Sequence, residues 1–131
     1  MEIKNKDFTY YGQVIINSSG DPVRKGIGGV YYKNGRYYEG EWVDGQRQGK
    51  GFEHFESQNT YQGDYVKGRA HGKGTYNWRN GEIYKGEWVD GLRHGKGKWK
   101  GIAGDSYEGD WINGKAHGFG VHVWKNGKLF I

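Results

Sequence analysis

Histidine residues recur at one position of the sequence and are the first candidates for chemistry. His71, His94 and His117 each precede a glycine, and they lie 23 residues apart. Imidazole nitrogens bind zinc at about 2 Å, so a site forms only if the fold brings these residues together. If each copy occupies one β-hairpin, successive copies lie about 10 Å apart, which is two strand spacings. We therefore interpret them as turn residues and predict no metal site and no cofactor.

Carboxylates recur in the same way, at Glu41, Asp64, Glu87 and Asp110. Their expected separation of about 10 Å is similar to that of the two carboxyl groups in an inverting glycosidase. Such a pair works only if the surroundings raise the pKa of one group selectively. Repeated surroundings, with lysines facing each carboxylate, give no such selectivity, and no serine, cysteine or lysine nucleophile lies beside a base. The sequence therefore predicts no catalytic residue and a non-enzymatic protein.

Lysine residues form a third recurring set, because Lys50, Lys73 and Lys96 each follow a glycine. A phosphate-binding loop requires Gly-x-x-x-x-Gly-Lys-Ser/Thr leading into a helix, and neither that spacing nor a helix is expected here. Two interpretations stay open. The lysines form a basic stripe that binds anionic lipid headgroups, or they belong to a solvated face on which they pair with Glu and Asp. The second is the commoner fate of charge runs.

Aromatic residues supply most of the apolar area that this chain can bury. The 131 residues include 6 Trp, 11 Tyr and 5 Phe, whereas only 34% of all residues are hydrophobic and 26 are glycine. Glycine adds no side chain to a core and costs backbone entropy on folding, so its abundance must serve geometry. Tyr and Trp rings carry a polar tip and tolerate partial exposure. This composition favours a thin, single-layer structure over a globular α/β domain.

Several other classes of protein are excluded by composition. The chain has one proline and no cysteine, which excludes collagen and a disulfide framework. Its aromatic content argues against disorder, and no apolar run reaches the roughly 20 residues of a membrane span. The segment from Met1 to Lys6 lacks the apolar stretch of a signal peptide, so we expect an intracellular protein. A formal charge of +5 permits acidic partners without selecting one.

A repeat of 23 residues positions all of these side chains. The segment Tyr-Glu-Gly-Glu-Trp-Val-Asp-Gly at residues 38–45 returns in related form from Tyr61, Tyr84 and Tyr107. A Gly-x-Gly segment follows each copy. The sequence predicts an irregular N-terminal strand region with a partial first repeat (1–37), four full repeats (38–129) and a C-terminal tail (130–131).

Each repeat is predicted to form a β-hairpin, because Asn-Gly and Asp-Gly turn signals separate runs of β-forming residues. In the second repeat we expect strands at Tyr61–Val66 and Gly72–Trp78, with a turn at Lys67–His71. Successive hairpins then form an all-β, elongated, single-layer antiparallel meander. Side chains alternate between faces, so rings fall on one face, over the glycines of the neighbouring strand. Acidic residues and lysines fall on the other face, where they pair across strands.

The last hairpin differs from the others. Ile112, Phe119, Val121 and Val123 make its second face apolar, and Leu129-Phe130-Ile131 follows. An apolar end of a sheet is a liability unless something covers it. A cap, a contact in a homodimer or larger complex, and the cut edge of a longer protein all explain it equally well.

The pattern Tyr-x-Gly-x-Trp-x-x-Gly-x-x-x-Gly-x-Gly at a 23-residue period resembles the MORN (membrane occupation and recognition nexus) repeat. Four copies match in register, with Tyr65 in place of Trp in the second and Gln48 in place of His in the first. The resemblance implies a scaffold in cytoskeletal or ciliary (axonemal, radial-spoke-like) assemblies, or attachment to membranes. The expected location is then the cytoplasm or cytoskeleton, with the cilium and the membrane surface as alternatives.

We predict that the aromatic face forms a groove that binds a peptide or helix of a protein partner. Trp and Tyr dominate the energy of such interfaces, and one side of each ring would stay available in a single-layer sheet. The competing interpretation is that the rings form the core. An anionic membrane lipid bound by Lys50, Lys73 and Lys96 is the alternative partner, and interspersed acidic residues argue against nucleic acid. The predicted protein-binding residues are Tyr38, Trp42, Tyr61, Tyr65, Trp78, Tyr84, Trp88, Trp99, Tyr107, Trp111 and Trp124.

Overall fold

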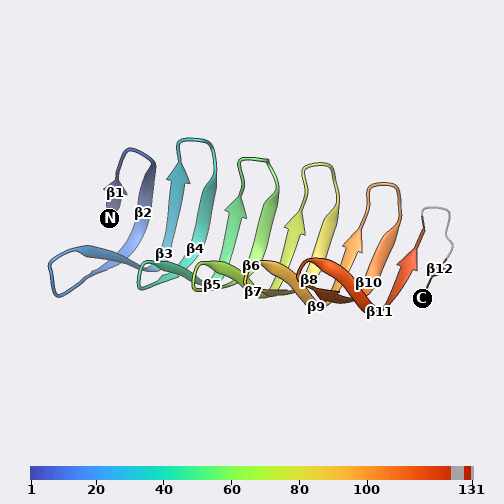
Figure 1. Cartoon of the computed structure of the whole chain (residues 1–131). Helices are drawn as coiled ribbons and strands as arrows, with labels where there is room; N and C mark the ends of the chain where they lie inside the picture. Colours follow the sequence, from blue (N-terminus) through green and yellow to red (C-terminus); the bar gives the residue numbers. More distant parts are fainter. Residues whose placement is uncertain (125–128, 131) are drawn as a thin grey trace.

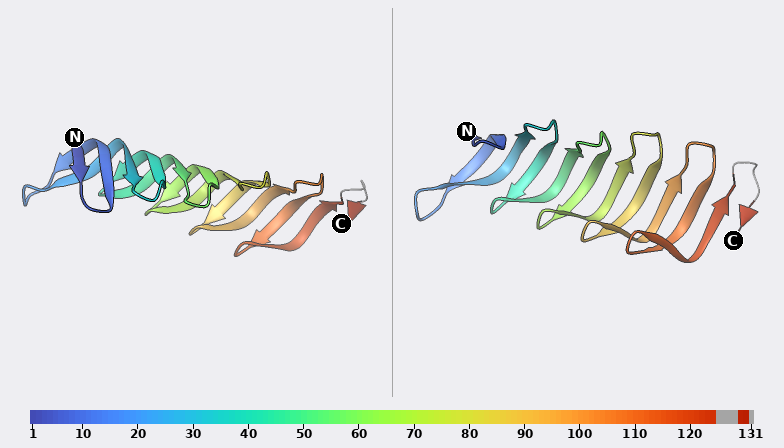
Figure 2. Two further views of the ribbon diagram at one scale, coloured as in Figure 1. Left: turned by 90° about the horizontal axis from the view of Figure 1, so that it is seen from above. Right: turned by 45° about the horizontal axis from the view of Figure 1, so that its top comes forward.

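The computed structural model describes residues 1–124 and 129–130, and it contains one antiparallel sheet of 12 strands in sequence order (Figure 1). The sheet is a single elongated layer with the two termini at opposite ends (Figures 1 and 2). This confirms the predicted meander of hairpins. One of the Asn-Gly turn signals of the sequence, Asn126-Gly127, and the tail residue Ile131 lie outside the described residues. The strands are β1 (Glu2–Lys4), β2 (Phe8–Ile16), β3 (Pro22–Tyr32), β4 (Tyr37–Val43), β5 (Gln46–His54), β6 (Thr60–Val66), β7 (Arg69–Asn77), β8 (Ile83–Val89), β9 (Leu92–Lys100), β10 (Ser106–Ile112), β11 (Lys115–Val123) and β12 (Leu129–Phe130).

Two-residue turns close the hairpins β4–β5, β6–β7, β8–β9 and β10–β11 at the lower edge of the sheet in Figure 1, whereas residues 17–21 form a longer loop between β2 and β3. Both turn residues have positive φ, for example 51° at Lys67 and 83° at Gly68, as a type I′ hairpin turn requires. The N–H of Gly68 donates to the carbonyl of Arg47 in the preceding repeat at 2.9 Å, so each turn also ties two repeats together. The predicted turn at Lys67–His71 is therefore too long. Strand β7 starts at Arg69, because this turn geometry closes the hairpin within two residues.

A β-bulge interrupts each of these hairpins. In the second repeat Gly63 pairs with Gly74 and Tyr65 pairs with Ala70, so Asp64 alone faces three residues of β7. The extra residues bend the strands, as bulges do. Each hairpin therefore has an upper and a lower limb at an angle to each other (Figures 1 and 2). We call the side inside this bend the inner face and the opposite side the outer face.

Tyrosine rings at the bend form the centre of the core on the inner face. The Tyr61 ring lies against Gly74 of the neighbouring strand, where a Cβ atom would be 2.3 Å from the tyrosine oxygen. Its hydroxyl donates to the carbonyl of Asp64 at 2.8 Å. This confirms the prediction that rings lie over glycines of the adjacent strand. The equivalent pairs are Tyr10 with Gly28, Tyr38 with Gly51, Tyr84 with Gly97 and Tyr107 with Gly120.

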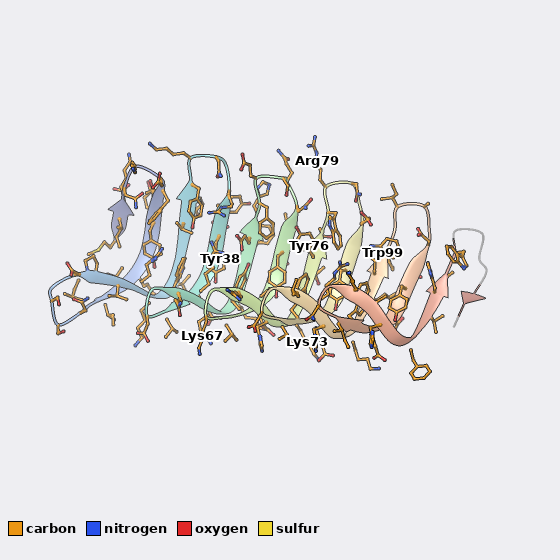
Figure 3. All side chains as sticks on the ribbon, in the orientation of Figure 1. Tyr38, Lys67, Lys73, Tyr76, Arg79 and Trp99 are labelled. Atoms are coloured by element: carbon orange, nitrogen blue, oxygen red, sulfur yellow. The ribbon has the colours of Figure 1, made fainter. Side chains whose placement is uncertain are left out.

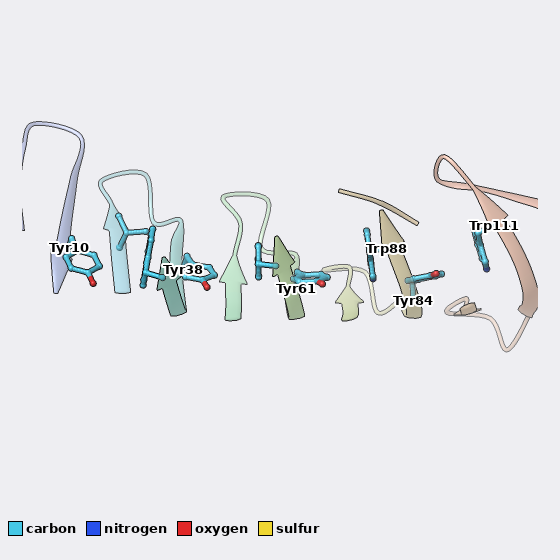
Figure 4. Packing of buried hydrophobic residues seen from close by; sticks show 9 residues of the cluster. Tyr10, Tyr38, Tyr61, Tyr84, Trp88 and Trp111 are labelled. Carbon is cyan, nitrogen blue, oxygen red and sulfur yellow. The ribbon is translucent and has the colours of Figure 1, made fainter. Parts of the chain in front are cut away.

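Edge-to-face contacts join these tyrosines to the rings of the lower limb. Tyr61 contacts Tyr65 at 5.2 Å and Trp88 at 5.3 Å between ring centroids, with nearly perpendicular planes. Contacts of this kind run without interruption from Tyr10 to Tyr107 (Figure 4 shows most of these rings). The indole N–H of Trp88 donates to the carbonyl of Gly74 at 3.0 Å, which satisfies its polar tip. The core is thus one row of rings along the whole array.

Replacing Gly74 by Ala should destabilise the array by about 3 kcal/mol, because the added methyl group overlaps the Tyr61 ring. Gly68→Asn is the matched control. That turn position has open space around it and a positive φ that Asn tolerates, so we expect a loss below about 1 kcal/mol. Urea unfolding followed by tryptophan fluorescence measures both. Equal losses would contradict the proposed role of the ring–glycine contact.

Candidate interaction surfaces

Most of the predicted contact residues lie in the core. Tyr38, Trp42, Tyr61, Tyr65, Tyr84, Trp88 and Trp111 are exposed by 7% or less. The expectation that one side of each ring stays available is therefore wrong for these side chains. In the bent sheet, glycine backbone covers one side of a tyrosine ring, and the edges of neighbouring rings cover the other. These residues form the core and have little surface left for a partner.

A second row of rings on the upper limb stays partly exposed. Trp78 and Trp99, which were predicted, and Tyr76, which was not, pack against the core without being buried. Tyr76 contacts Trp78 at 4.6 Å between ring centroids. Figure 3 shows Tyr76 and Trp99 one after the other along the array. We call Tyr76, Trp78 and Trp99 the aromatic rim.

A cavity lies beside the aromatic rim, and two further predicted rings lie toward the C-terminal end of the array. Trp78 also borders a cavity of about 360 Å³ together with Asn59, Arg79 and Asn80. Tyr107 is partly buried beside the core. Trp124 is 48% exposed and stacks on His122 at 4.2 Å. The sequence signal for Tyr76 was its repeat position, since Trp99 lies 23 residues after it.

Arginine side chains lie on the inner face between the rings. The Arg93 guanidinium lies 4.8 Å from the Trp111 ring and 5.5 Å from the Trp78 ring. Burial lowers the pKa of Arg93 from its ordinary value, and its side chain donates to the carbonyl of Gly114 at 2.7 Å. Arg24 and Arg47 occupy the same repeat position and also lie over rings. The inner face thus combines partly exposed rings with positive charge.

In the second repeat Tyr65 replaces tryptophan, and a buried ion pair accepts the hydrogen bond of its hydroxyl group. Glu53 is 5% exposed, and its carboxylate accepts from Arg47 at 2.9 Å and from the Tyr65 hydroxyl at 2.8 Å. Burial and the nearby Glu53 charge raise the pKa of Tyr65. In the next repeat Ala70, Tyr76 and Trp88 occupy the equivalent positions of Arg47, Glu53 and Tyr65. The first set of residues fills its space with a hydrogen-bonded ion pair, and the second fills the equivalent space with a methyl group and two aromatic rings.

The outer face carries the predicted lysines. Lys50 pairs with Asp64, and Lys96 pairs with Asp110. These pairs join the second strand of one repeat to the first strand of the next. Among residues 1–124, Lys73 and Lys85 form no ion pair within 4.0 Å; together with Lys96 they line a cavity of about 580 Å³. In Figure 3 Lys73 lies on the side away from Tyr38 and Tyr76.

The recurring carboxylates hold the bulges together. Asp64 accepts the backbone N–H of Lys73 at 3.0 Å, beside Gly72 with its φ of 100°. A carboxylate at this position closes the gap that the extra bulge residues leave in the ladder of hydrogen bonds. Glu41, Glu87 and Asp110 accept the N–H groups of Lys50, Lys96 and Phe119 in the same way.

The recurring histidines are strand residues, which corrects their interpretation as turn residues. His71, His94 and His117 lie in β7, β9 and β11 because the preceding turns are short. The His71 ring accepts the N–H of Asp90 in the next turn at 3.3 Å. In residues 1–124 and 129–130, no group of three or more His, Cys, Asp or Glu is placed to hold a metal ion. The same residues include no helix of the length and apolarity that crossing a bilayer requires.

The C-terminal hairpin has the apolar outer face that was predicted. Phe119 is 87% exposed, Ile112 42% and Val121 38%. The part of Leu129–Phe130 that the structure describes is the backbone, which pairs with His122 and Val123 in β11.

Asp64 should make the stability of the array depend on pH. Hydrogen bonds from Lys50 and from the Lys73 backbone hold its pKa below the ordinary value. A lowered pKa stabilises the folded state above the unfolded pKa of about 3.9, and this contribution is lost as the pH falls through the folded value. Asp64→Asn should therefore lower Tm by a few degrees at pH 7, and this difference should shrink as the pH falls below the unfolded pKa of about 3.9. Circular dichroism melts from pH 2.5 to 7 test this; a constant difference would contradict it.

The buried Glu53 cluster gives a prediction with an internal control. Arg47→Ala should cost about 3 kcal/mol of unfolding free energy, because it leaves the Glu53 charge buried without its partner. The triple variant Arg47→Ala, Glu53→Tyr, Tyr65→Trp copies the next repeat and should return within about 1 kcal/mol of the wild type. Denaturant titration measures both variants. A triple variant as unstable as the single one would show that the two repeats are not equivalent environments.

Matches to a known protein family recur along the chain, one for each hairpin repeat. The MORN repeat matches residues 38–60, 61–83, 84–106 and 107–128. Comparison with curated protein sequences gives no match. Four consecutive matches cover more than half of the sequence, and each matched unit contains a ring–glycine contact and a bulge carboxylate. The chain belongs to the MORN-repeat family.

Proposed function

We propose that this chain is a non-enzymatic scaffold that binds a peptide or helix of a partner protein along its inner face. MORN repeats are common in proteins that take part in protein or membrane interactions. The observation that carries the proposal is the partly exposed aromatic rim of Tyr76, Trp78 and Trp99 beside the buried core. Trp and Tyr are the residues that most often dominate the energy of a protein interface.

Rigid positioning makes this rim suited to binding. Trp99 donates its indole N–H to Glu82 at 3.1 Å, and Tyr76 accepts from the amide of Asn59 at 3.0 Å. Rings that are already fixed lose little conformational entropy when a partner binds. Tyr107 and Trp124 would extend the contact surface toward the C-terminal repeats, while the seven buried rings support it from below.

The repeat spacing favours a helical partner. Successive repeats lie about 10 Å apart, and seven residues of an α-helix also span about 10 Å. A helix running along the array would present an apolar side chain to Tyr76 and another, seven residues later, to Trp99. The inner-face arginines Arg24 and Arg93 favour acidic residues beside that apolar stripe. From the family resemblance, we propose that such a partner belongs to a cytoskeletal or ciliary assembly.

Attachment to an anionic membrane is the second candidate, because Lys73, Lys85 and Lys96, together with one acid, Glu87, line the 580 Å³ cavity on the outer face. Lys50 and Lys96 already have acidic partners within the chain. Screening at 0.5 M salt shortens electrostatic attraction to a few ångströms. Membrane binding through these lysines would therefore be lost at high salt, whereas contact through the aromatic rim would persist.

Trp78→Ala combined with Trp99→Ala should abolish capture of the partner while leaving the buried rings of the core in place. The measurement is a tagged pull-down from native lysate in 0.5 M salt, read by mass spectrometry against the wild type. Lys98→Ala, on the outer face, is the matched control and should retain the partner. Circular dichroism must show that the double variant is folded.

Three outcomes decide between the candidates. A stoichiometric protein that the double variant loses and the control retains supports the inner face. Retention of that protein by the folded double variant rejects the aromatic rim. Binding that occurs only on anionic vesicles at low salt, and that charge reversal of Lys50, Lys73 and Lys96 removes, supports membrane attachment instead.

A further inference from the structure

We propose that the first hairpin holds a carboxylate-binding pocket, which takes the C-terminal residue of a partner chain. The pocket has a volume of about 230 Å³ and is lined by residues of β1, β2 and β3 and by Gly45 in the turn of the next repeat. It is separate from the aromatic rim, because β4, β5 and β6 lie between β3 and the strand that carries Tyr76. The inference goes beyond the proposed function, since a chain end can bind here whether or not a helix lies on the aromatic rim.

A single cation stands in an otherwise uncharged wall. Arg24 is the one charged residue among those that line the pocket. A pocket of this kind, apolar with a few convergent polar groups, is the usual form of a ligand site. Its cation selects a ligand that carries a negative charge on an apolar body. The other side chains of the wall are those of Ile3, Phe8, Tyr10, Pro22 and Val23.

Aromatic rings hold the Arg24 guanidinium in place. Its central carbon lies 4.7 Å from the centroid of the Trp42 ring, 5.7 Å from that of Phe8 and 5.9 Å from that of Tyr10. Among residues 1–124 and 129–130, this half-buried side chain forms no ion pair within 4.0 Å and donates no hydrogen bond. A guanidinium has five N–H donors and binds carboxylates through two of them at once. Arg24 is therefore positioned for an acceptor that the chain itself does not supply.

The arginines at the same position of other repeats do have acceptors. Arg47 donates to the buried carboxylate of Glu53 at 2.9 Å. Arg93 donates to the backbone carbonyl of Gly114 at 2.7 Å. Each of these two side chains is therefore satisfied within the array, in contrast to Arg24.

The first repeat lacks both kinds of acceptor. Val30 stands one repeat before Glu53, is fully buried and offers no polar atom in its side chain. Gly45 stands three repeats before Gly114, but it lines the pocket, and in the described part of the chain no hydrogen bond joins it to the Arg24 side chain. Pro22 follows the longer loop of residues 17–21, which Figure 1 shows at the N-terminal end of the sheet, and completes the wall. The pocket thus occupies the place of the missing acceptor.

A C-terminal residue fits this pocket better than an acidic side chain. The cavity has room for about eight atoms of water size, because one water molecule takes roughly 30 Å³. An Asp or Glu side chain would bring only one or two methylene groups beside its carboxylate and leave most of the apolar wall uncovered. A terminal leucine carries its carboxylate and its apolar side chain on the same carbon atom. It can therefore pair with Arg24 and cover Phe8 and Val23 at the same time.

Small model compounds test the site directly. The probes are N-acetyl-leucine and N-acetyl-leucinamide, which differ in the terminal carboxylate, titrated into the ¹⁵N-labelled full chain and followed by NMR. N-acetyl-leucine should shift the Gly45 N–H and Arg24 Nε–H signals, with a Kd on the order of 1 mM for so small a ligand. The amide should bind at least tenfold more weakly. A hexapeptide, Gly-Ser-Gly-Ser-Gly-Leu with a free carboxylate, should bind at least as tightly as N-acetyl-leucine.

Three variants separate the pocket from general charge. Arg24→Gln should weaken binding of N-acetyl-leucine at least tenfold, because it removes the charge and keeps a polar side chain. Lys25→Gln is the matched control, since it removes the same charge from the neighbouring, exposed position and should leave the affinity unchanged. Val30→Glu gives Arg24 the carboxylate that Arg47 receives from Glu53, and it should weaken binding at least tenfold with Arg24 still present. Circular dichroism melts identify the variants that are folded.

Several results would overturn the inference. Equal binding of N-acetyl-leucine and its amide, or wild-type affinity in a folded Arg24→Gln variant, would show that no ion pair with Arg24 forms. Signal changes confined to residues outside the pocket, or none at ten times the expected Kd, would show that the pocket is not a site. Binding of N-acetyl-leucine without binding of the hexapeptide would assign the pocket to free acids and reject a chain end. None of these measurements involves Trp78 or Trp99, so they leave the proposed function of the aromatic rim to its own test.

Discussion

Each repeat depends on a tyrosine ring that lies against the bare backbone of a glycine on the next strand. Tyr61 and Gly74 are one example: the ring occupies the volume where any Cβ would sit, and the tyrosine hydroxyl is satisfied by a carbonyl three residues away. A single sheet normally lacks a second layer to bury its apolar face. Here the ring–glycine contact and the bend at each bulge supply the missing cover, and the interlocked rings extend the core along the array.

The repeated charges follow from the same bend. A carboxylate such as Asp64 is needed because the bulge leaves a backbone N–H without a partner, and its second oxygen pairs with a lysine of the preceding repeat. The recurring carboxylates, whose expected spacing is similar to that of a catalytic pair, therefore stabilise the bulges. Their repetition also gives the outer face an alternating pattern of acids and lysines. One structural requirement thus shapes both faces of the sheet.

The two faces support different interactions. The inner face offers Tyr76, Trp78 and Trp99 as fixed rings beside arginines, which suits a helix lying along the array. The outer face lies on the outside of the bend and is polar and charged, with Lys73, Lys85 and Lys96 around one cavity.

The sequence by itself determined the repeat, its hairpins and the pairing of rings with glycines, because periodicity and side-chain alternation are local properties. It did not determine which rings stay exposed. Trp88 and Trp99 look alike in sequence, but the bend buries the first at 7% exposure and leaves the second at the rim. It also placed His71 in a turn, since the turn length depends on backbone geometry at Lys67 and Gly68. Only the tertiary structure decides these points, because exposure depends on which limb a side chain lies on and what packs over it.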